Sequence, residues 1–286
     1  MKIAAATIQM ASEPGRVASN LDRADAHLRR ARDLGAELAV LPEMFNTGYG
    51  LVPDYAPTAE GRDGPTLRHL AARSREWGMG IAFGFVESDG HHLYDSLGFC
   101  QPDGQLDVYR KRHLVFWERF RFRPGREPVI VASPWGRIGF AICADMIYRR
   151  TWADYRGKVD LAIVAAAWPD FACRLSGRKH WLFGQLGPLS ASIPAKVAAE
   201  LDVPVLFSNQ VGDTQTCIPI LGGRIADRFA GMSSLCDGLH GISALAGTAE
   251  DVLIAPLTIH PARGPRTWRS MSPSAREASF SGSEPV

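Results

Sequence analysis

The sequence predicts an α/β fold built from strand–helix–strand units. Residues 3–9 form an apolar run typical of a buried strand, residues 21–34 place leucine and alanine on one helical face, and residues 36–41 form a second apolar run that stops at Pro42. A unit of this kind requires helices over a largely buried sheet and locates ligands at the carboxyl ends of the strands. Glu43 falls at such an end.

Apolar periodicity and turn signals predict the remaining elements. We expect helices near residues 66–77, 149–155 and 188–201, and strands at 79–87, 93–101, 106–110, 129–132, 137–142, 161–166 and 203–208. Turn sequences at 88–91, 102–105 and 133–136 join successive strands, so meandering strands accompany the alternating units.

The chain is long enough for one large domain. Of its 286 residues 46% are hydrophobic, which suffices for a substantial core. No clear linker precedes residue 258, so we expect a single domain over residues 1–258. From His260 the sequence becomes rich in Pro, Arg and Ser, which predicts an extended arm or a disordered tail over residues 259–286.

The composition excludes several classes of function. The 32 Lys and Arg nearly balance the 30 Asp and Glu and form no stripe, so we expect a small-molecule substrate and no nucleic-acid partner. No apolar run is long enough to cross a membrane, and the apolar start is too short for a signal peptide, so we expect no membrane association and a cytoplasmic location. The five cysteines are odd in number and lack a CxxC pair, which argues against a disulfide framework and a metal site.

Three reactive side chains stand where an apolar run ends or just beyond it: Glu43, Lys111 and Cys143. Taken singly, such a Glu or Lys is usually a solvated loop residue, and such a Cys is usually a small core residue. If the strands before them are parallel neighbours, or nearly so, all three groups meet at one mouth of the sheet. We therefore treat them together as candidate catalytic residues.

Amide hydrolysis needs these residue types together. The reaction benefits from a strong nucleophile, a proton shuttle and positive charge at the carbonyl oxygen. A thiol with an ordinary pKa of about 8.5 is only a few per cent ionised at neutral pH, so Cys143 needs a base or cation nearby. Glu43 can pass the thiol proton to the departing amine and then activate water. Lys111 and the backbone N–H of Ala144 can hold the oxyanion, at about 3 kcal/mol per donor.

Three segments resemble the signatures of the nitrilase superfamily of carbon–nitrogen hydrolases, and they occur in the family's order. They are Leu-Pro-Glu-Met-Phe-Asn-Thr-Gly-Tyr at 41–49, Tyr-Arg-Lys-Arg-His-Leu at 109–114 and Gly-Phe-Ala-Ile-Cys-Ala-Asp at 139–145. The resemblance covers residues 3–258. It implies a four-layer α–β–β–α sandwich, a triad of Glu43, Lys111 and Cys143, no cofactor, and assembly as a homodimer or a higher homo-oligomer.

The same resemblance suggests roles for further residues. Glu118 resembles the family's second glutamate, which hydrogen-bonds near the lysine and helps to orient the substrate. We expect Trp168 to line the pocket, although a core aromatic at the end of a strand is an equally good interpretation. Asp145 is expected to fix the turn behind the nucleophile, while Asn209 and Gln210 are expected to support the backbone or the pocket edge.

Residues of the substrate pocket are predicted from chemistry and position. Tyr49, Trp117 and Phe45 would form apolar walls, and Ala144 follows the nucleophile. Arg174 or Arg178 would contact an anionic or polar substrate tail, and a solvated basic loop is the alternative interpretation.

The sequence after the nucleophile favours one reaction over its relatives. Cys143-Ala144-Asp145 resembles amidases and N-carbamoyl hydrolases more than nitrile hydrolases, which tend to have Cys-Trp-Glu. We therefore expect hydrolysis of a small amide or N-carbamoyl compound through a thioester. The alternatives are an acyl- or amidotransferase with the same acyl-enzyme, nitrile hydrolysis, and a binding protein without catalysis, which the intact triad disfavours.

Overall fold

The computed structural model describes residues 1–50, 54–170, 174–175, 178–179, 188–217, 224–238 and 241–261. Its helices are α1 (Val17–Asp33), α2 (Pro65–Trp77), α3 (Arg149–Ala153) and α4 (Leu189–Leu201), with short 3-10 helices η1 (Ala56–Thr58), η2 (Phe116–Phe120) and η3 (Cys143–Ile147). Its strands are β1 (Lys2–Ala11), β2 (Leu38–Val40), β3 (Gly80–Ser88), β4 (Leu93–Cys100), β5 (Leu106–Arg110), β6 (Ile130–Ser133), β7 (Gly136–Ile142), β8 (Leu161–Ala166), β9 (Arg174–Leu175), β10 (Arg178–Lys179), β11 (Val205–Val211), β12 (Asp213–Cys217), β13 (Arg224–Arg228), β14 (Ser234–Asp237), β15 (Gly241–Leu245) and β16 (Asp251–Thr258).

One large sheet folds back on itself. In the described part of the chain it has 12 strands, in the order β5-β4-β3-β2-β1-β11-β8-β7-β6, with β16 beside β1 and β14 and β15 beyond β11. Strand β1 joins the two halves only at its end, where Met10 and Ala11 pair with β11. Beyond this seam the halves stack face to face: the ring of Phe99 in β4 lies 5.8 Å from that of Phe140 in β7.

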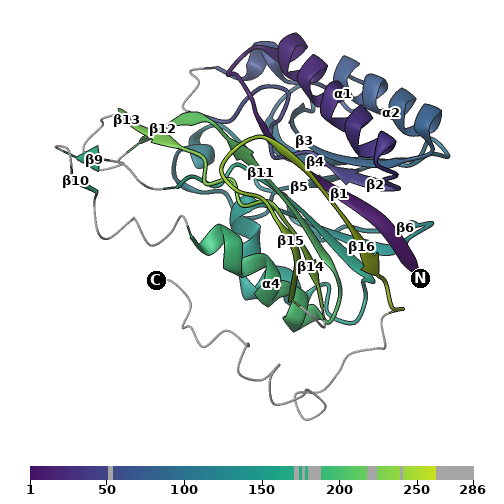
Figure 1. Ribbon diagram of the computed structural model, residues 1–286. Coiled ribbons are helices and arrows are strands. Elements are labelled where there is room, and N and C mark those ends of the chain that lie inside the picture. The colour runs from purple at the N-terminus through teal and green to yellow at the C-terminus, as the bar shows by residue number, and fades with distance from the viewer. Residues whose placement is uncertain are drawn as a thin grey trace.

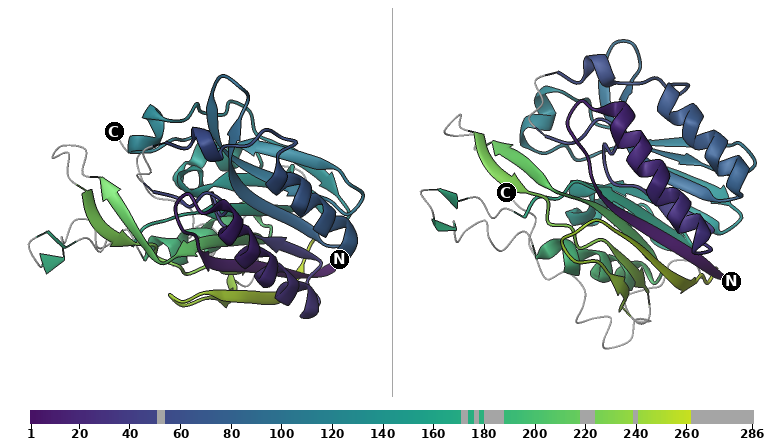
Figure 2. Two further views of the ribbon diagram at one scale, coloured as in Figure 1. Left: turned by 90° about the horizontal axis from the view of Figure 1, so that it is seen from above. Right: turned by 45° about the horizontal axis from the view of Figure 1, so that its top comes forward.

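Helices cover the outer faces of both halves, which gives four layers. Figure 1 shows α1 and α2 over the half that contains β1 to β5, and α4 on the opposite side of the molecule against β14 and β15. The turned views in Figure 2 show the same arrangement. The predicted α–β–β–α sandwich is therefore confirmed. None of the helices in the described ranges is both long and apolar enough to cross a membrane.

Strand β1 is apolar on both faces because both faces are buried. Ile3 and Ala5 contribute to the core between the two halves, whereas Ile8 and Met10 pack beneath the helices of the outer layer. This alternation follows from the two-residue period of a strand. Helix α2 begins at a proline, which suits a first helical turn. It ends at Trp77 and is followed by Gly78, whose φ of +62° suits a glycine.

The predicted elements agree with the structure up to β11, with boundaries that differ by a few residues. No element was predicted after residue 208, and β12 to β16 follow there. Strand β16 pairs antiparallel along β1, from Lys2↔Thr258 to Gln9↔Asp251. Its stability depends on a partner at the other end of the chain, which local periodicity does not reveal. Of the predicted tail at 259–286, residues 262–286 lie outside the described ranges.

Candidate active site

The three candidate catalytic residues follow strands that are not neighbours. Glu43 follows β2, Lys111 follows β5 and Cys143 follows β7. The condition of neighbouring strands is not met, since β3 and β4 separate β2 from β5, and β7 belongs to the other half of the sheet. The groups come together because the halves stack face to face. Glu43 and Lys111 are close enough to Cys143 to shift the pKa of its thiol.

Lys111 is the centre of a buried cluster of charges. Its Nζ lies 2.6 Å from Glu43 Oε1, 2.7 Å from Glu118 Oε1 and 3.0 Å from Asp95 Oδ2, and all four side chains are fully buried. Nζ donates hydrogen bonds to Glu43 and Glu118, whereas its contact with Asp95 is an ion pair without a hydrogen bond. Burial lowers the pKa of Lys111, but Glu118, Glu43 and Asp95 outweigh it and hold the pKa well above its usual range.

Glu43 is held at both its side chain and its backbone. Its Oε2 accepts a 2.6 Å hydrogen bond from the Ala167 N–H, and Gln210 Nε2 donates to its carbonyl oxygen at 2.7 Å. The chain passes so close to β3 that a Cβ atom on Gly84 would lie 2.4 Å from the Cα of Glu43. A glycine is therefore required at residue 84 for this approach, and Gln210 supports the backbone as predicted.

Glu118 lies beside Lys111, as the sequence predicted. It belongs to η2, and its Oε1 accepts both Lys111 Nζ and the Tyr49 hydroxyl at 2.7 Å. Its Oε2 accepts the Val115 N–H at 2.9 Å. Burial raises the pKa of Glu118, and the hydrogen bond from Lys111 opposes this rise. The Glu118 carboxylate thus connects Lys111 to the aromatic side chain of Tyr49.

Cys143 stands in a strained turn between β7 and η3. Its φ of +44° is uncommon for any residue other than glycine. Asp145 fixes this turn, because its Oδ2 accepts the Ile142 N–H at 3.1 Å and the Tyr109 hydroxyl at 2.7 Å. Asp145 Oδ1 also accepts the His113 N–H at 2.8 Å. This agrees with the structural role that the sequence predicted for Asp145.

The thiol of Cys143 is kept protonated by its surroundings. Burial is the main cause that raises its pKa well above the usual value, and the negative charges of Glu43 and Glu118 add to this. Lys111 and a hydrogen bond from the Ala167 N–H act in the opposite direction. A thiol in this environment needs a base to become a nucleophile.

Aromatic side chains flank the cluster on the side of Glu118. The Tyr49 ring lies 5.2 Å from that of Trp117, which stacks on Tyr55 at 6.1 Å. The prediction for Phe45 was wrong: it is fully buried in the core beneath α1 and α2, 6.3 Å from the ring of Phe83. Residue 45 follows Glu43 by two positions, but the turn at Met44, with φ +47°, directs the chain into the outer core.

The other predicted pocket residues fall into two groups. Trp168 is buried two residues after β8 ends. Its backbone N–H donates a hydrogen bond to Asn209 Oδ1 at 2.7 Å, so Asn209 supports the backbone here. Ala144 is buried directly after the nucleophile. Arg174 and Arg178 lie in β9 and β10, but their side chains are outside the described part of the structure.

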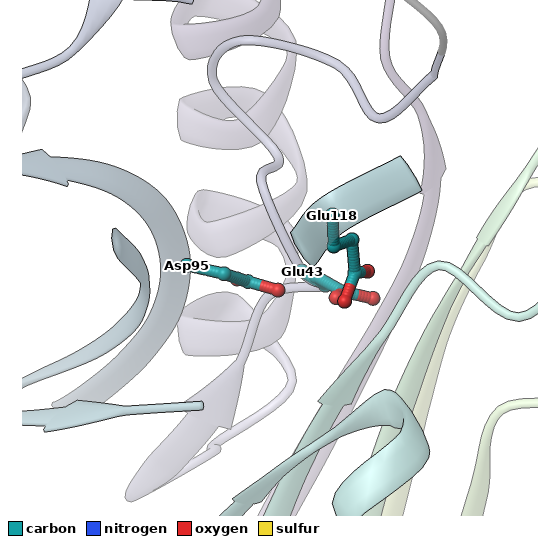
Figure 3. A group of neighbouring side chains, drawn as sticks. All are labelled: Glu43, Asp95 and Glu118. Carbon is teal, nitrogen blue, oxygen red and sulfur yellow. The ribbon is translucent and has the colours of Figure 1, made fainter. Parts of the chain in front are cut away.

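Asp95 was not predicted from the sequence. It is the third residue of β4, and its carboxyl group points toward Glu43 and Glu118 in Figure 3. The sequence signal that could have identified it was an acid in a mostly apolar strand. Among the described residues these three carboxyl groups have oxygens within 4.8 Å of one another, a spacing that suits a metal ion. However, Lys111 Nζ lies within 3.0 Å of each of them, so an ammonium group already supplies the cation.

The fold and the site together define a class: an α–β–β–α sandwich with a buried thiol beside a lysine and acidic residues. Residues 4–258 match the family model of the carbon-nitrogen hydrolases. The chain therefore belongs to the carbon–nitrogen hydrolase family, within the nitrilase superfamily.

Curated relatives include proteins named for amide and nitrile hydrolysis. The chain is 33% identical to a nitrilase of Pyrococcus abyssi over 45% of its length and 51% of the relative. It is 30% identical to an omega-amidase of Danio rerio over 59% of its length and 64% of the relative. Both alignments thus span less than two thirds of the relative. A hydrolase of Pseudomonas protegens is 30% identical over 88% of this chain and 81% of its own.

Solved structures show the same fold. A carbon–nitrogen hydrolase superfamily protein of Xanthomonas campestris has a TM-score of 0.74 and 24% identity, over 90% of this chain and 91% of the other. An amidase of Nesterenkonia has a TM-score of 0.72 and 19% identity, over 89% of this chain and 90% of the other.

Proposed function

We propose that this protein hydrolyses a small amide or N-carbamoyl compound through a thioester on Cys143. The observation that supports this most directly is the cluster in which Lys111 Nζ binds Glu43 at 2.6 Å and Glu118 at 2.7 Å beside the buried thiol. The cluster supplies a nucleophile, a base and a cation, which are the three groups that amide cleavage requires.

Acylation would start at the protonated thiol. Glu43 takes the proton from Cys143 Sγ as the sulfur attacks the carbonyl carbon of the substrate. Lys111 Nζ and the Ala144 N–H stabilise the negative charge that develops on the carbonyl oxygen. The tetrahedral intermediate then breaks its carbon–nitrogen bond, Glu43 returns the proton to the leaving nitrogen, and the acyl group remains on sulfur.

Deacylation would reuse the same base. Glu43 takes a proton from water, and the oxygen attacks the thioester carbon beside Lys111. When the carbon–sulfur bond breaks, the proton on Glu43 passes to Cys143 and the acid product leaves. One water is consumed and one amine or ammonia is released, so the free site returns to its starting state.

The sequence favours an amide over a nitrile. The residue after Cys143 is alanine, and this resembles amidases and carbamoyl hydrolases more than nitrile hydrolases. Structures of a Glu-to-Gln mutant of the Nesterenkonia amidase show the Michael addition of acrylamide, and the covalent addition of the acetamide moiety of fluoroacetamide, at the active-site cysteine of that protein. Small amides of this size are therefore the first compounds to test. Assembly as a homodimer or higher homo-oligomer and a cytoplasmic location remain part of this proposal.

The test is release of ammonia or amine from a panel of small amides, N-carbamoyl compounds and nitriles. We expect wild-type protein to act on a subset of amides or carbamoyl compounds and Cys143→Ala to act on none. Cys236→Ala is the matched control, because Cys236 is also a buried free thiol but lies in β14, and it should keep full activity. Activity that persists in Cys143→Ala, or a preference for nitriles, would contradict the proposal.

A further inference from the structure

The cluster around Lys111 contains more negative than positive groups. Glu43, Asp95 and Glu118 offer three carboxylates, while Lys111 supplies one ammonium, and all four side chains are fully buried. A buried charge is stable only when it is paired and hydrogen-bonded. One cation cannot balance three anions in this environment, so at least one carboxyl group is expected to hold a proton.

Hydrogen-bond donors are shared unequally among the three carboxyl groups. Glu118 accepts bonds from Lys111, the Tyr49 hydroxyl and the Val115 N–H. Glu43 accepts bonds from Lys111 and the Ala167 N–H.

Asp95 has the poorest supply of donors. Neither of its buried oxygens accepts a hydrogen bond from the described residues, and Lys111 Nζ lies 3.0 Å from Oδ2, the longest of the three lysine contacts. An ionised carboxylate has only acceptor sites, whereas a protonated one gains an O–H donor. The proton therefore belongs on Asp95, which then has a hydrogen to donate.

We propose that Asp95 is a positioning residue of the site and that its carboxyl group is protonated, donating a hydrogen bond to Glu43 while Glu43 and Glu118 remain ionised. This inference rests on the proposed function for its catalytic consequences. The neutral acid would orient Glu43 toward Lys111 without adding a third negative charge. It would also compete weakly for the lysine, so that one N–H of Lys111 can turn to the oxygen of a substrate.

The electrostatic surroundings of Asp95 support this assignment. Burial raises its pKa well above the usual value, Glu43 and Glu118 raise it further, and Lys111 only partly opposes them. Tyr55 also interacts with Asp95, and burial raises the pKa of the Tyr55 hydroxyl. A tyrosine that stays protonated does not favour ionisation of Asp95.

Substitutions at Asp95 separate a neutral acid from a required charge. Asp95→Asn keeps the shape, an acceptor and a donor, so it should retain most of the wild-type kcat on the amide that the protein hydrolyses. Asp95→Leu removes the hydrogen bond, and kcat should fall by about 100-fold because the base and the lysine lose their alignment. The control is Asp107→Asn on β5. Among the described residues the Asp107 carboxylate accepts a hydrogen bond only from Gln105, so this substitution should leave kcat unchanged.

The pH profile adds a readout that a purely structural role would not move. Ionisation of Asp95 at high pH adds a third negative charge beside Glu43, so Asp95→Asn should extend the kcat/KM profile to higher pH. A loss of kcat in Asp95→Asn equal to that in Asp95→Leu would overturn the proposal, because it would show that a charged carboxylate is needed. Full activity in Asp95→Leu would overturn it as well.

Infrared difference spectroscopy tests the proton without any turnover, so it holds even if the proposed reaction is wrong. The spectrum of wild-type protein minus Asp95→Asn should contain the C=O stretch of a protonated carboxylic acid, and the spectrum of wild type minus Asp107→Asn should lack it. Carboxylate bands in place of the protonated band would overturn the inference. Failure of the hydrolase proposal would instead appear as activity that persists in Cys143→Ala, so the two failures are distinguishable.

Discussion

Two clusters of charged side chains, each with a buried carboxyl group, lie on opposite faces of β4 and β5. On the inner face of β4 and β5, Asp95 and Lys111 meet Glu43 and Glu118. On the outer face, the residues adjacent to them in the chain, Ser96 and Arg110, meet Glu87 of β3. Adjacent residues of a strand point to opposite faces, so one strand pair builds both clusters.

The outer cluster has more cation than anion. Glu87 is almost fully buried, and its oxygens accept bonds from Arg62 at 2.7 Å, from Arg110 at 2.8 Å and from Ser96 at 2.7 Å. Burial raises the pKa of Glu87, but the bonds from Arg110, Arg62 and Ser96 outweigh it and keep the pKa below its usual value. The cluster is at the edge of an open cavity of 630 Å³ lined by Arg62 and Arg110.

The contrast distinguishes an acid that stabilises the fold from acids suited to proton transfer. Glu87 is satisfied and stays ionised, so it has no proton to exchange near neutral pH. Around Lys111 the acids outnumber the cation, burial and neighbouring carboxylates raise the pKa of Asp95 well above its usual value, and Glu43 and Glu118 lie close enough to the Cys143 thiol to shift its pKa. Perturbed groups of this kind gather at functional sites.

The largest expected difference is between the activities of two variants, in which either Glu43 or Glu87 loses its charge. Glu43→Gln should lower kcat by about 10²–10⁴ because the site loses its base. Glu87→Gln should leave kcat nearly unchanged, because its partners are arginines on the outer face. Steady-state kinetics on the same amide, with circular dichroism to confirm folding, makes the comparison. Equal losses in both variants would remove the distinction between the two clusters.

A smaller loss of kcat is expected where β3 packs against the backbone of Glu43 in the inner cluster. A methyl group in Gly84→Ala would lie 2.4 Å from the Cα of Glu43 and must displace it. A shift of about 1 Å in a catalytic base can lower kcat by about 100-fold. Gly247→Ala is the matched control, since a Cβ there meets nothing within 4 Å. Wild-type kinetics in Gly84→Ala would show that the position of Glu43 tolerates this displacement.

The smallest effect concerns stability of the outer cluster. Glu87→Gln should lower the free energy of unfolding by about 1–3 kcal/mol at neutral pH, since a buried hydrogen-bonded charge is lost. The pKa of Glu87 is lower in the folded protein than in the unfolded chain, so its contribution is present above the unfolded pKa of about 4.3 and is lost as the pH falls through the folded value.

Urea denaturation of wild type and Glu87→Gln over a pH series measures this difference. We expect the gap between the two proteins to close as the solution becomes more acid. A gap that stays constant with pH would mean that packing, and not charge, accounts for the loss.

Much of the fold could be predicted from the sequence because its first part has strong local signals. The apolar runs before Glu43 and Cys143 end within a residue or two of the observed strands. The strands after residue 211 could not be found in this way, since β16 depends on pairing with β1. The approach of the two halves could not be predicted either, because β7 lies against β4 by stacking and not by pairing.

The site was predicted unevenly for similar reasons. Glu43, Lys111, Glu118 and Cys143 fall in short motifs, and the structure brings them together. Asp95 has no motif, and its importance appears only when its distance from Lys111 is known. Phe45 was misplaced because the left-handed turn at residue 44 changes its direction.

The central claim is that Cys143 holds the acyl group during cleavage of a carbon–nitrogen bond. Rapid-quench intact-protein mass spectrometry, followed by peptide mapping, tests it directly on an amide that the protein consumes. We expect a transient adduct with the mass of the substrate's acyl group, located on the Cys143 peptide, which forms and decays at least as fast as turnover. Ammonia release without such an adduct, or an adduct on another residue, would contradict it.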